Sequence, residues 1–562
     1  MLTIVFFAVF AATSSAKIVT YNFDIGWVNI APDGFSRPVI AINGKWPIPI
    51  IEVDVGDTVI ITATNSLRNQ TTSLHFHGQY QGGTASADGT AGITQCPIYP
   101  GESYIYNFTA WPAGTHWYHS HVKGQYADGL RGLMIIHDHD WENSLDVDEQ
   151  VYLTISDWWH EEQPPIIDRY MSPDNRDGDI ESPDTLLLND SRNAPDLHFD
   201  PGTRYLLRLA NIGGLACSNF HIEGYNMTVV AIDGSTVCPY EIGTIRPCAG
   251  QRYDVIVTGQ EHGAKDLRYI AKMSADITVS DLPPLNLRSV IGNVIRKGNR
   301  DHSSKEGTVA LSETLTPDWT PVKVLNEFDL SDLDEVPLFE PVNHNIYLIS
   351  NMSYFEGIGT RTALGILPWV NPRVPTLYTA LTSGPKAEYA STYGAGVDPW
   401  VLESDSVVQI YMENPDPWPH PMHLHGHRFQ LVRLGSGIWD GDESDLPATP
   451  ASRDTVVVPP YGYVVLRFRA DNPGVWLFHC HIDLHMIGGM SSTFIEAPKE
   501  LQAQQAINRD SVDACNRAKI PTLGNCAAKL EHISWEQSLE SCYTVFNFKP
   551  RSFSAMFFEG QE

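Results

Sequence analysis

Four short histidine-rich segments constrain this chain more than any other feature of its sequence. They read His-Phe-His-Gly at 75–78, Trp-Tyr-His-Ser-His at 117–121, His-Pro-Met-His-Leu-His-Gly-His at 420–427 and His-Cys-His-Ile-Asp-Leu-His at 479–485. In an extended segment both rings of a His-x-His pair lie on one face, because side chains alternate with a period of two. Each buried imidazole left without a partner would cost about 1–3 kcal/mol. The four segments therefore predict metal binding.

The ligand types in the last two segments favour copper. A thiolate, two imidazoles and a weak axial thioether make up the trigonal blue-copper electron-transfer site. The chain supplies this set in His420, Cys480, His485 and Met490. Because Cys480 lies between two histidines, its thiolate can bind this copper while His479 and His481 face the other way. The spacing predicts a covalent route for electrons from one copper to a neighbouring group of metal ions.

Chain length and net charge limit the number of domains and the kinds of partner that we expect. At 562 residues the chain exceeds one ordinary core, and three domains are the first estimate. Lys and Arg number 37 against 67 Asp and Glu, which gives a formal net charge of −30. Such a charge repels phosphate backbones and anionic membrane surfaces. We therefore expect no nucleic acid partner.

The first sixteen residues predict export. They form an apolar run that ends in small residues, with Ser14 and Ala16 at the positions that a signal peptidase requires. Five Asn-x-Ser/Thr sequons fit the same route, at Asn69, Asn107, Asn189, Asn226 and Asn351. No later stretch reaches the roughly 18–20 apolar residues needed to span a bilayer. We expect a secreted, glycosylated, monomeric protein of the extracellular space or cell wall, without a membrane anchor.

Short β-rich runs separated by Gly, Pro, Asn and Asp fill most of the chain. Their spacing of roughly 8–12 residues is typical of β-sandwiches and barrels. A first unit ends near the strand LMIIHD, and a second ends in the polar stretch at 296–307, which we interpret as an exposed linker. Weak internal repetition supports this division, since GESYIYNFTAWPAGTHWYHSH is echoed by GYVVLRFRADNPGVWLFHCH.

On these segments the chain resembles the multicopper oxidases, the family of laccases, ascorbate oxidases and ferroxidases. The resemblance covers nearly the whole mature chain and implies an all-β fold of three consecutive cupredoxin-like, Greek-key β-barrel or sandwich domains. We place a signal peptide at 1–16, the domains at 17–145, 146–305 and 306–498, and a short, partly helical tail at 499–562. The blue copper would lie in the third domain, with a trinuclear cluster clasped between the first and third.

The resemblance also implies four copper ions per chain and assigns their ligands. The type 1 copper takes His420, Cys480 and His485, with Met490 placed axially. The type 2 copper takes His75 and His423, and the type 3 pair takes His77, His119, His121, His425, His479 and His481. Four one-electron oxidations then reduce one O₂ to two waters, which also consumes protons.

Two aspartates match the carboxylates that handle protons beside the cluster in this family. They are Asp88 in TASADG and Asp483 in HCHIDLH. Each could instead cap a turn or orient a ligand imidazole. We put Asp88 ahead of Asp483.

Within the family, the sequence resembles the fungal ferroxidase-like branch, which includes soluble oxidases of pigment pathways. The matching phrases are HFHGQYQGGTASADG, HSHVKGQYADGLRG and ADNPGVWLFHCHI. Ferroxidases of this branch bind Fe²⁺ with carboxylates near the type 1 histidines. Asp416 matches one of them, Glu181 matches a second if one gap is allowed, and the register of Asp276 as a third is not secure.

The reducing substrate stays open between two small molecules. A carboxylate at the type 1 edge can bind Fe²⁺, and it can equally accept the proton of a phenol as the electron leaves. Iron-uptake ferroxidases of this branch carry a C-terminal membrane helix, which we do not find in this sequence. We therefore rank a laccase-like oxidation of phenolic pigment or secondary-metabolite precursors first and a ferroxidase second. A non-catalytic copper-binding protein is disfavoured, because all eight cluster histidines are present.

Seven cysteines remain once Cys480 is set aside as a ligand. Because seven is odd, at least one must be free or paired between chains in an oxidising compartment. The resemblance implies that Cys96 bridges to the C-terminal tail, with Cys515 or Cys526 as candidates. A bridge within the second domain would draw on Cys217, Cys238 and Cys248.

Overall fold

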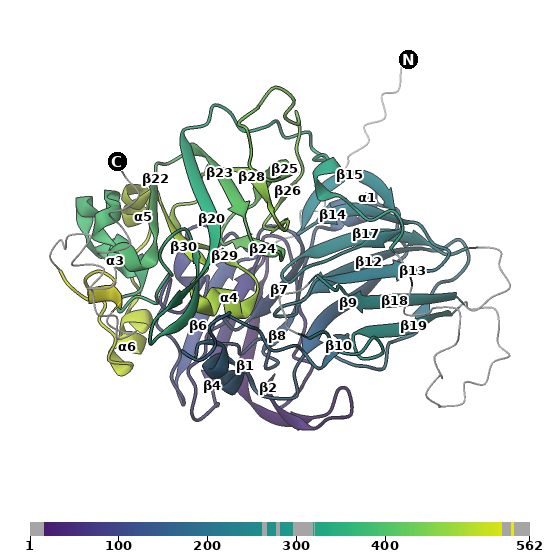
Figure 1. Ribbon diagram of the computed structural model, residues 1–562, viewed down its shortest axis with the longest axis horizontal. Coiled ribbons are helices and arrows are strands. Elements are labelled where there is room, and N and C mark those ends of the chain that lie inside the picture. The colour runs from purple at the N-terminus through teal and green to yellow at the C-terminus, as the bar shows by residue number, and fades with distance from the viewer. Residues whose placement is uncertain are drawn as a thin grey trace, which may run out of the picture.

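Three β-sandwich units follow one another along the chain. The computed structural model describes residues 16–260, 267–276, 281–295, 319, 321–530 and 541–543. Figure 1 shows the first unit in purple to blue, the second in teal and the third in green. The expected signal peptide, apart from Ala16, and the expected linker at 296–307 lie outside the described residues.

The first unit consists of two four-stranded sheets. One has the order β2-β1-β4-β6, from β1 (Ile18–Ile30), β2 (Arg37–Ile42), β4 (Thr58–Asn65) and β6 (Ser103–Thr109). The other has the order β3-β8-β7-β5, from β3 (Ile51–Asp54), β5 (His75–His77), β7 (Gly114–His119) and β8 (Arg131–His137). Burial alternates along β4, so one face of its sheet packs on the core of the unit.

The second unit has a six-stranded and a five-stranded sheet. The first has the order β10-β9-β12-β17-β14-β15, from β9 (Glu149–Trp158), β10 (Thr185–Leu188), β12 (Arg204–Asn211), β14 (Met227–Ile232), β15 (Ser235–Ile242) and β17 (Arg252–Thr258). The second has the order β11-β19-β18-β13-β16, from β11 (Leu197–His198), β13 (Ser218–Ile222), β16 (Thr244–Ile245), β18 (Leu267–Met273) and β19 (Ser289–Ile295).

The third unit repeats that arrangement. Its larger sheet has the order β21-β20-β23-β28-β25-β26, from β20 (His344–Phe355), β21 (Gly359–Leu364), β23 (Ser406–Asn414), β25 (Phe429–Ser436), β26 (Ser452–Arg453) and β28 (Gly462–Ala470). Its smaller sheet has the order β22-β30-β29-β24-β27, from β22 (Pro399–Leu402), β24 (His420–Leu424), β27 (Thr455–Val458), β29 (Gly474–Cys480) and β30 (Ser491–Glu496).

The strand pairing repeats in all three units. A parallel pair lies inside one sheet of each unit, formed by β1 with β4, β9 with β12, and β20 with β23. A second parallel pair lies at one edge of the other sheet, formed by β3 with β8, β11 with β19, and β22 with β30. The expected all-β fold of three cupredoxin-like units is therefore confirmed, while the residue boundaries between them stay predictions.

Short helices join and cover the sheets. The α-helices are α1 (His139–Ser144), α2 (Gln163–Tyr170), α3 (Thr376–Thr382), α4 (Asp483–Gly488), α5 (Pro498–Gln504) and α6 (Arg509–Arg517). The 3₁₀ turns are η1 (Ala85–Ala87), η2 (Glu327–Asp329), η3 (Gly384–Glu388), η4 (Ala390–Thr392) and η5 (Ala395–Val397). Among the described residues, none of the helices has both the length and the apolar character needed to cross a membrane.

Candidate metal centre

The two histidine segments of the first unit lie on adjacent strands. β5 pairs with β7, and His75 lies directly opposite His119. Because side chains alternate along β5, the two flanking histidines share one face while Phe76 points into the core of the unit, against Tyr106 and Phe108. The buried aromatic side chain fixes the direction in which the paired imidazoles point.

The two segments of the third unit are arranged in the same way. β24 pairs with β29, which sets His423 opposite His479 and Met422 opposite Cys480. The alternation along β29 places Cys480 on the face opposite to His479 and His481. The thiol therefore belongs to one candidate site and its two sequence neighbours to another, as the spacing predicts.

Eight imidazoles from the two units meet between these strands. The rings of His77 and His423 stack with centroids 3.7 Å apart, and those of His75 and His425 with centroids 4.0 Å apart. Ligand atoms lie within 4.8 Å of one another in several triads, one of which is His121, His425 and His479. The complete group comprises His75, His77, His119, His121, His423, His425, His479 and His481.

The hydrogen bonds of these rings fit a metal cluster. Several rings bond a protein oxygen through Nδ1, for example His75 to the Asp88 carbonyl at 2.7 Å and His119 to the Ser120 carbonyl at 2.9 Å. Their other nitrogen is left without a partner although it is buried, as found for Nε2 of His75, His119 and His423. One nitrogen tied to the protein and one free is the pattern expected of metal-ligating histidines.

The charge state of the rings fits the same conclusion. Burial and the neighbouring imidazoles lower the pKa of His119, His121 and His479 well below the usual range. These rings are therefore neutral near pH 7. A neutral imidazole is the form that binds a metal ion.

A second candidate site contains a thiol. His420, Cys480 and His485 form a buried triad, in which the thiol Sγ lies 3.7 Å from Nδ1 of each histidine. Met490 is fully buried, and its main chain binds that of Cys480 and of His485. Burial raises the pKa of the Cys480 thiol, so a metal ion must displace its proton to bind there. The donor set fits the expected blue copper.

Asp88 binds two of the candidate ligands directly. Its carboxylate accepts hydrogen bonds from His425 Nδ1 at 3.1 Å and from Thr90 at 2.6 Å, and it lies 3.2 Å from His75 Nδ1. Burial opposes its charge, but the His425 and His75 imidazoles outweigh that cost and hold the pKa of Asp88 well below its usual range. The structure thus gives Asp88 an orienting contact with two imidazoles, which is the alternative role allowed for it from the sequence.

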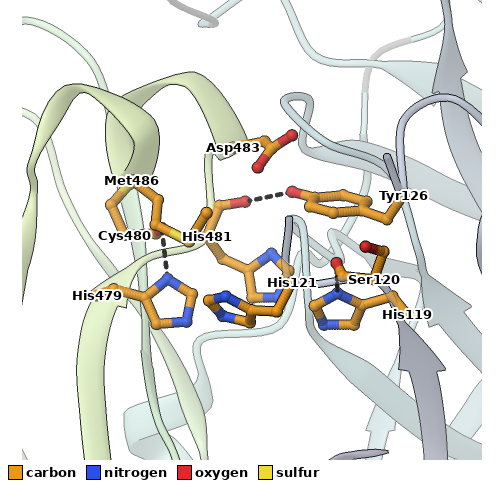
Figure 2. A pocket seen from close by; sticks show the side chains of 9 residues that line it. All are labelled: His119, Ser120, His121, Tyr126, His479, Cys480, His481, Asp483 and Met486. Carbon is orange, nitrogen blue, oxygen red and sulfur yellow. Dashed lines mark hydrogen bonds between the residues drawn. The ribbon is translucent and has the colours of Figure 1, made fainter. Parts of the chain in front are cut away.

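Asp483 has a different environment. It begins α4 beside a buried cavity of about 10 Å³, which is also lined by Tyr126, His481 and Met486 (Figure 2). A cavity of this size holds about one water molecule. Neither carboxylate oxygen has a hydrogen-bond partner, and burial, together with the negative charges of Asp128 and Asp157, raises the pKa of Asp483 to about 8. In the metal-free chain Asp483 is therefore a protonated acid next to the imidazole cluster.

Asp416 lies at the outer edge of the thiol site. Its Oδ2 accepts a hydrogen bond from His420 Nε2 at 2.9 Å and from the Ser350 hydroxyl at 3.2 Å. His420 is buried, whereas the Asp416 side chain is 20% exposed. Asp416 therefore connects a candidate type 1 ligand to the protein surface.

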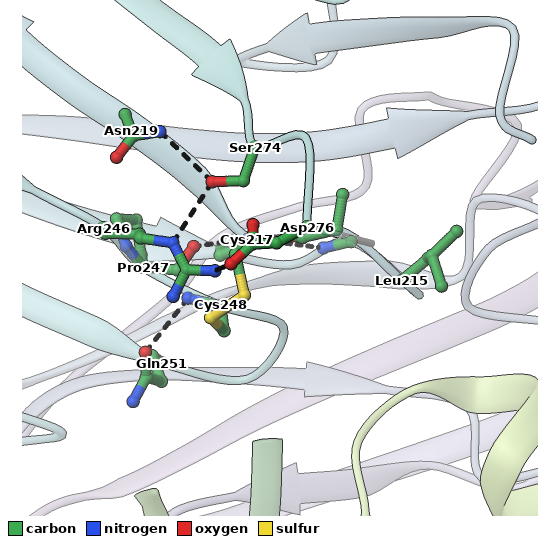
Figure 3. Close-up of a disulfide and its surroundings, with 12 residues drawn as sticks. Leu215, Cys217, Asn219, Arg246, Pro247, Cys248, Gln251, Ser274 and Asp276 are labelled. Carbon is green, nitrogen blue, oxygen red and sulfur yellow. Dashed lines mark hydrogen bonds and ion pairs between the residues drawn. A yellow bond between two sulfur atoms is a disulfide. The ribbon is translucent and has the colours of Figure 1, made fainter. Parts of the chain in front are cut away.

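The other two expected carboxylates are held by arginines. Glu181 accepts from Arg169 Nη2 at 2.8 Å and lines a surface cleft of about 390 Å³ together with Asp174 and Asp179. Asp276 pairs with Arg246 beside the Cys217–Cys248 disulfide (Figure 3). Of the three carboxylates, all within the described residues, Asp416 is the one that hydrogen-bonds a candidate type 1 ligand.

Sequence reasoning missed one buried carboxylate at the cluster, Asp454. Its Oδ1 accepts from His77 Nε2 at 3.1 Å, and its main-chain oxygen accepts from His423 Nδ1 at 3.0 Å. Arg252 of the second unit donates two hydrogen bonds to the same carboxylate. The only signal in the sequence was an Arg-Asp pair at the start of an apolar run.

The disulfides in the structure show which cysteines pair, which the sequence left open. Cys96 bonds Cys515 rather than Cys526, which instead bonds Cys542. Cys217 bonds Cys248. Besides Cys480, the free cysteine among the described residues is Cys238, so one unpaired thiol accounts for the odd number. The first bridge ties the tail to the first unit.

Known proteins are similar to this chain in sequence and in architecture. Family models described as multicopper oxidase match residues 24–140, 149–283 and 369–500. The iron transport multicopper oxidase FET3 of Gibberella zeae is 41% identical over 521 residues, which cover 91% of this chain and 81% of the relative. FET5 of Saccharomyces cerevisiae, with the same description, is 37% identical over 92% of this chain and 86% of its own length.

Solved structures of multicopper oxidases are also similar to this chain. The crystal structure of Fet3p, described as a multicopper oxidase that functions in iron import, has a TM-score of 0.83 at 34% identity, covering 91% of this chain and 97% of that one. The laccase of Botrytis aclada has a TM-score of 0.75 at 26% identity, covering 94% and 95%. The chain belongs to the multicopper oxidase family, whose members hold four copper ions per chain and use O₂ as the electron acceptor.

Proposed function

We propose that this multicopper oxidase is a ferroxidase, which oxidises Fe²⁺ to Fe³⁺ and passes the electrons to O₂. The observation that carries the proposal is the Asp416 carboxylate, which is partly exposed and hydrogen-bonded to His420 at 2.9 Å. Relatives with 34–41% identity are described as iron transport proteins. These findings favour Fe²⁺ over the phenol that we ranked first from the sequence, and we reverse that order.

The ligand assignment made from the sequence is part of the proposal. The buried thiol site would hold the type 1 copper, and the eight converging imidazoles would hold the type 2 ion and the type 3 pair. When bound, the copper ions supply one-electron acceptance at the first site and four-electron reduction of O₂ at the cluster. Cys480 and its flanking histidines join the two sites through one short stretch of backbone at the end of β29.

Asp416 would bind and orient the incoming iron. Both described hydrogen bonds to its carboxylate end on Oδ2, which leaves Oδ1 available for a cation. A carboxylate oxygen is a hard ligand that suits Fe³⁺ even better than Fe²⁺, so it favours loss of the electron. The imidazole of His420 lies directly behind it and continues inward to the thiol of Cys480.

Asp483 would handle protons, whereas Asp88 would position the ligand imidazoles. Asp483, beside a cavity with room for one water, would supply protons that the reduction of O₂ consumes. Asp88, ionised and bonded to two imidazoles, would orient them instead. This order reverses the one that we drew from the sequence.

Location outside the cytoplasm is also part of the proposal. Three disulfides among the described residues fit an oxidising compartment.

The experiment compares two reductants on the purified, copper-loaded protein. O₂ uptake is measured with Fe²⁺ and with a diphenol for the native chain, for Asp416→Ala combined with Glu181→Ala, and for Asp405→Asn as a control at the other end of β23. We expect the double variant to lose most Fe²⁺ turnover and to keep diphenol turnover. Faster native turnover of the diphenol, or equal losses with both reductants, would favour the laccase-like function.

A further inference from the structure

A buried ion pair joins the second unit to the imidazole cluster. Arg252 donates from Nη1 to Asp454 Oδ1 at 2.7 Å and from Nη2 to Oδ2 at 2.6 Å, and both side chains are fully buried. Asp454 belongs to the third unit, and the histidine that it accepts from, His77, belongs to the first. This contact therefore links all three units at one point beside the cluster.

His77 is oriented differently from its neighbours. Five of the eight rings bond protein oxygens through Nδ1, namely His75, His119, His423, His425 and His479. His77 instead bonds through Nε2, to Asp454 Oδ1 at 3.1 Å and to the Thr455 hydroxyl at 3.2 Å. Its Nδ1 faces His481 Nε2 at 3.2 Å. Two imidazole nitrogens at that distance can bind a common metal ion.

We infer that Asp454, held by Arg252, is a positioning residue that fixes His77 as the Nε2–H tautomer and so leaves Nδ1 for copper. An ionised carboxylate can only accept hydrogen bonds, so it requires the N–H on the nitrogen that faces it. Without that acceptor, the other tautomer would place a proton on the nitrogen that must bind the metal. The inference rests on the ligand assignment proposed above.

The second unit thereby takes part in the copper centre although none of its side chains is a proposed ligand. Its Asp233 accepts from the main-chain N–H of Arg252 at 2.7 Å and from Arg453 Nε at 2.9 Å. Arg252 Nε also donates to the Thr115 carbonyl of the first unit at 3.0 Å. Arg252 is thus held by both neighbouring units. Two nitrogens of its guanidinium group hold the Asp454 carboxylate in one orientation toward His77.

A plain stabilising ion pair is the rival explanation, and a nearby pair provides the control. Arg208 donates to Asp254 at 3.0 Å in an equally buried contact within the second unit, and Asp254 also accepts from Thr115 of the first unit. Asp254 makes no described hydrogen bond to any of the eight histidines. Asp254→Asn therefore measures the cost of weakening a buried ion pair without disturbing a tautomer.

The test measures copper retention in Asp454→Asn and Asp254→Asn, purified as full-length protein and dialysed against a copper chelator. Total copper per chain is compared with the blue absorption per chain, which reports the type 1 site alone. Asparagine can turn either its oxygen or its N–H₂ toward His77 Nε2, so it no longer requires the N–H there, and weakening the contact behind a ligating histidine lowers metal affinity about 10- to 100-fold. We expect Asp454→Asn to lose cluster copper and to keep its blue absorption, and Asp254→Asn to keep both.

A further variant keeps the test decisive. If Asp454→Asn does not fold, Arg252→Lys retains the charge but not the two-pronged contact, and we expect the same selective loss of copper in milder form. Full copper retention in the folded Asp454 or Arg252 variant, or equal copper loss in Asp254→Asn, overturns the inference.

Failure of this inference can be separated from failure of the proposed function. His77→Ala tests the ligand assignment alone, because it removes the imidazole itself. Copper loss in His77→Ala with full retention in Asp454→Asn would overturn the positioning role only. A native protein with full copper that does not oxidise Fe²⁺ would overturn the ferroxidase proposal only.

Discussion

Asp416→Asn is expected to raise the reduction potential of the type 1 copper by about 40–60 mV. The Asp416 carboxylate accepts a hydrogen bond from His420 Nε2 at 2.9 Å, and its negative charge favours the oxidised, more positive site. A hydrogen bond to a charged group is worth about 1–1.5 kcal/mol more than a neutral one. Since 1.4 kcal/mol corresponds to about 59 mV for a single electron, loss of the charge gives the stated shift. Asparagine keeps the shape and an acceptor oxygen.

The assay is a redox titration of the blue absorption in the native protein, in Asp416→Asn and in Asp405→Asn. Asp405 lies at the turn before β23, whereas Asp416 follows the other end of that strand. A nine-residue strand is about 30 Å long, so charge removal at Asp405 should leave the potential unchanged. An unchanged or lower potential in Asp416→Asn, or an equal rise in Asp405→Asn, would refute the reasoning.

Four other variants have defined outcomes. Met490→Leu removes the weak axial donor and should also raise the type 1 potential, which the same titration checks; a fall would contradict the axial assignment. Cys96→Ser opens a bridge between residues 419 positions apart and should lower the free energy of unfolding by about 2–5 kcal/mol in urea, whereas Cys238→Ser should change it little. Burial raises the pKa of the Asp398 carboxyl to about 6, so its contribution to stability is lost as pH rises through about 4 to 6. Asp398→Asn should therefore exceed the native stability by about 1–3 kcal/mol at pH 8 and match it near pH 4; equal midpoints at both pH values would contradict this.

The fold and the metal-binding faces could be predicted because they depend on local sequence pattern. Alternation along His75-Phe76-His77 places two imidazoles on one face whatever the rest of the chain does. The same rule separates Cys480 from its flanking histidines. Both structural features follow from a period of two residues.

The environments of the carboxylates could not be predicted, because they depend on contacts between distant parts of the chain. Asp454 reaches His77 across 377 positions, and no spacing rule connects them. Asp88 and Asp483 look alike in sequence, but one has partners on its carboxylate and the other has none. Their different pKa directions come from these surroundings.

The choice of substrate depends least on local sequence. Asp416 lies four positions before His420, which made a contact plausible from the sequence, but the choice between Fe²⁺ and a phenol depends on the shape and charge of the surface around it. Arg169 neutralises part of the Glu181 charge, and this could be seen only in the folded chain. The partly exposed Asp416 carboxylate, together with relatives described as iron transport oxidases, favours iron.

The ferroxidase function is tested most directly by the ratio of Fe²⁺ oxidised to O₂ consumed by the copper-loaded protein. We expect four Fe²⁺ for each O₂ and no released peroxide, because electrons would enter singly at the site of His420 and Cys480 and leave together at the imidazole cluster. A ratio of two with peroxide released, or no Fe²⁺ oxidation by protein that holds its full copper, would contradict it.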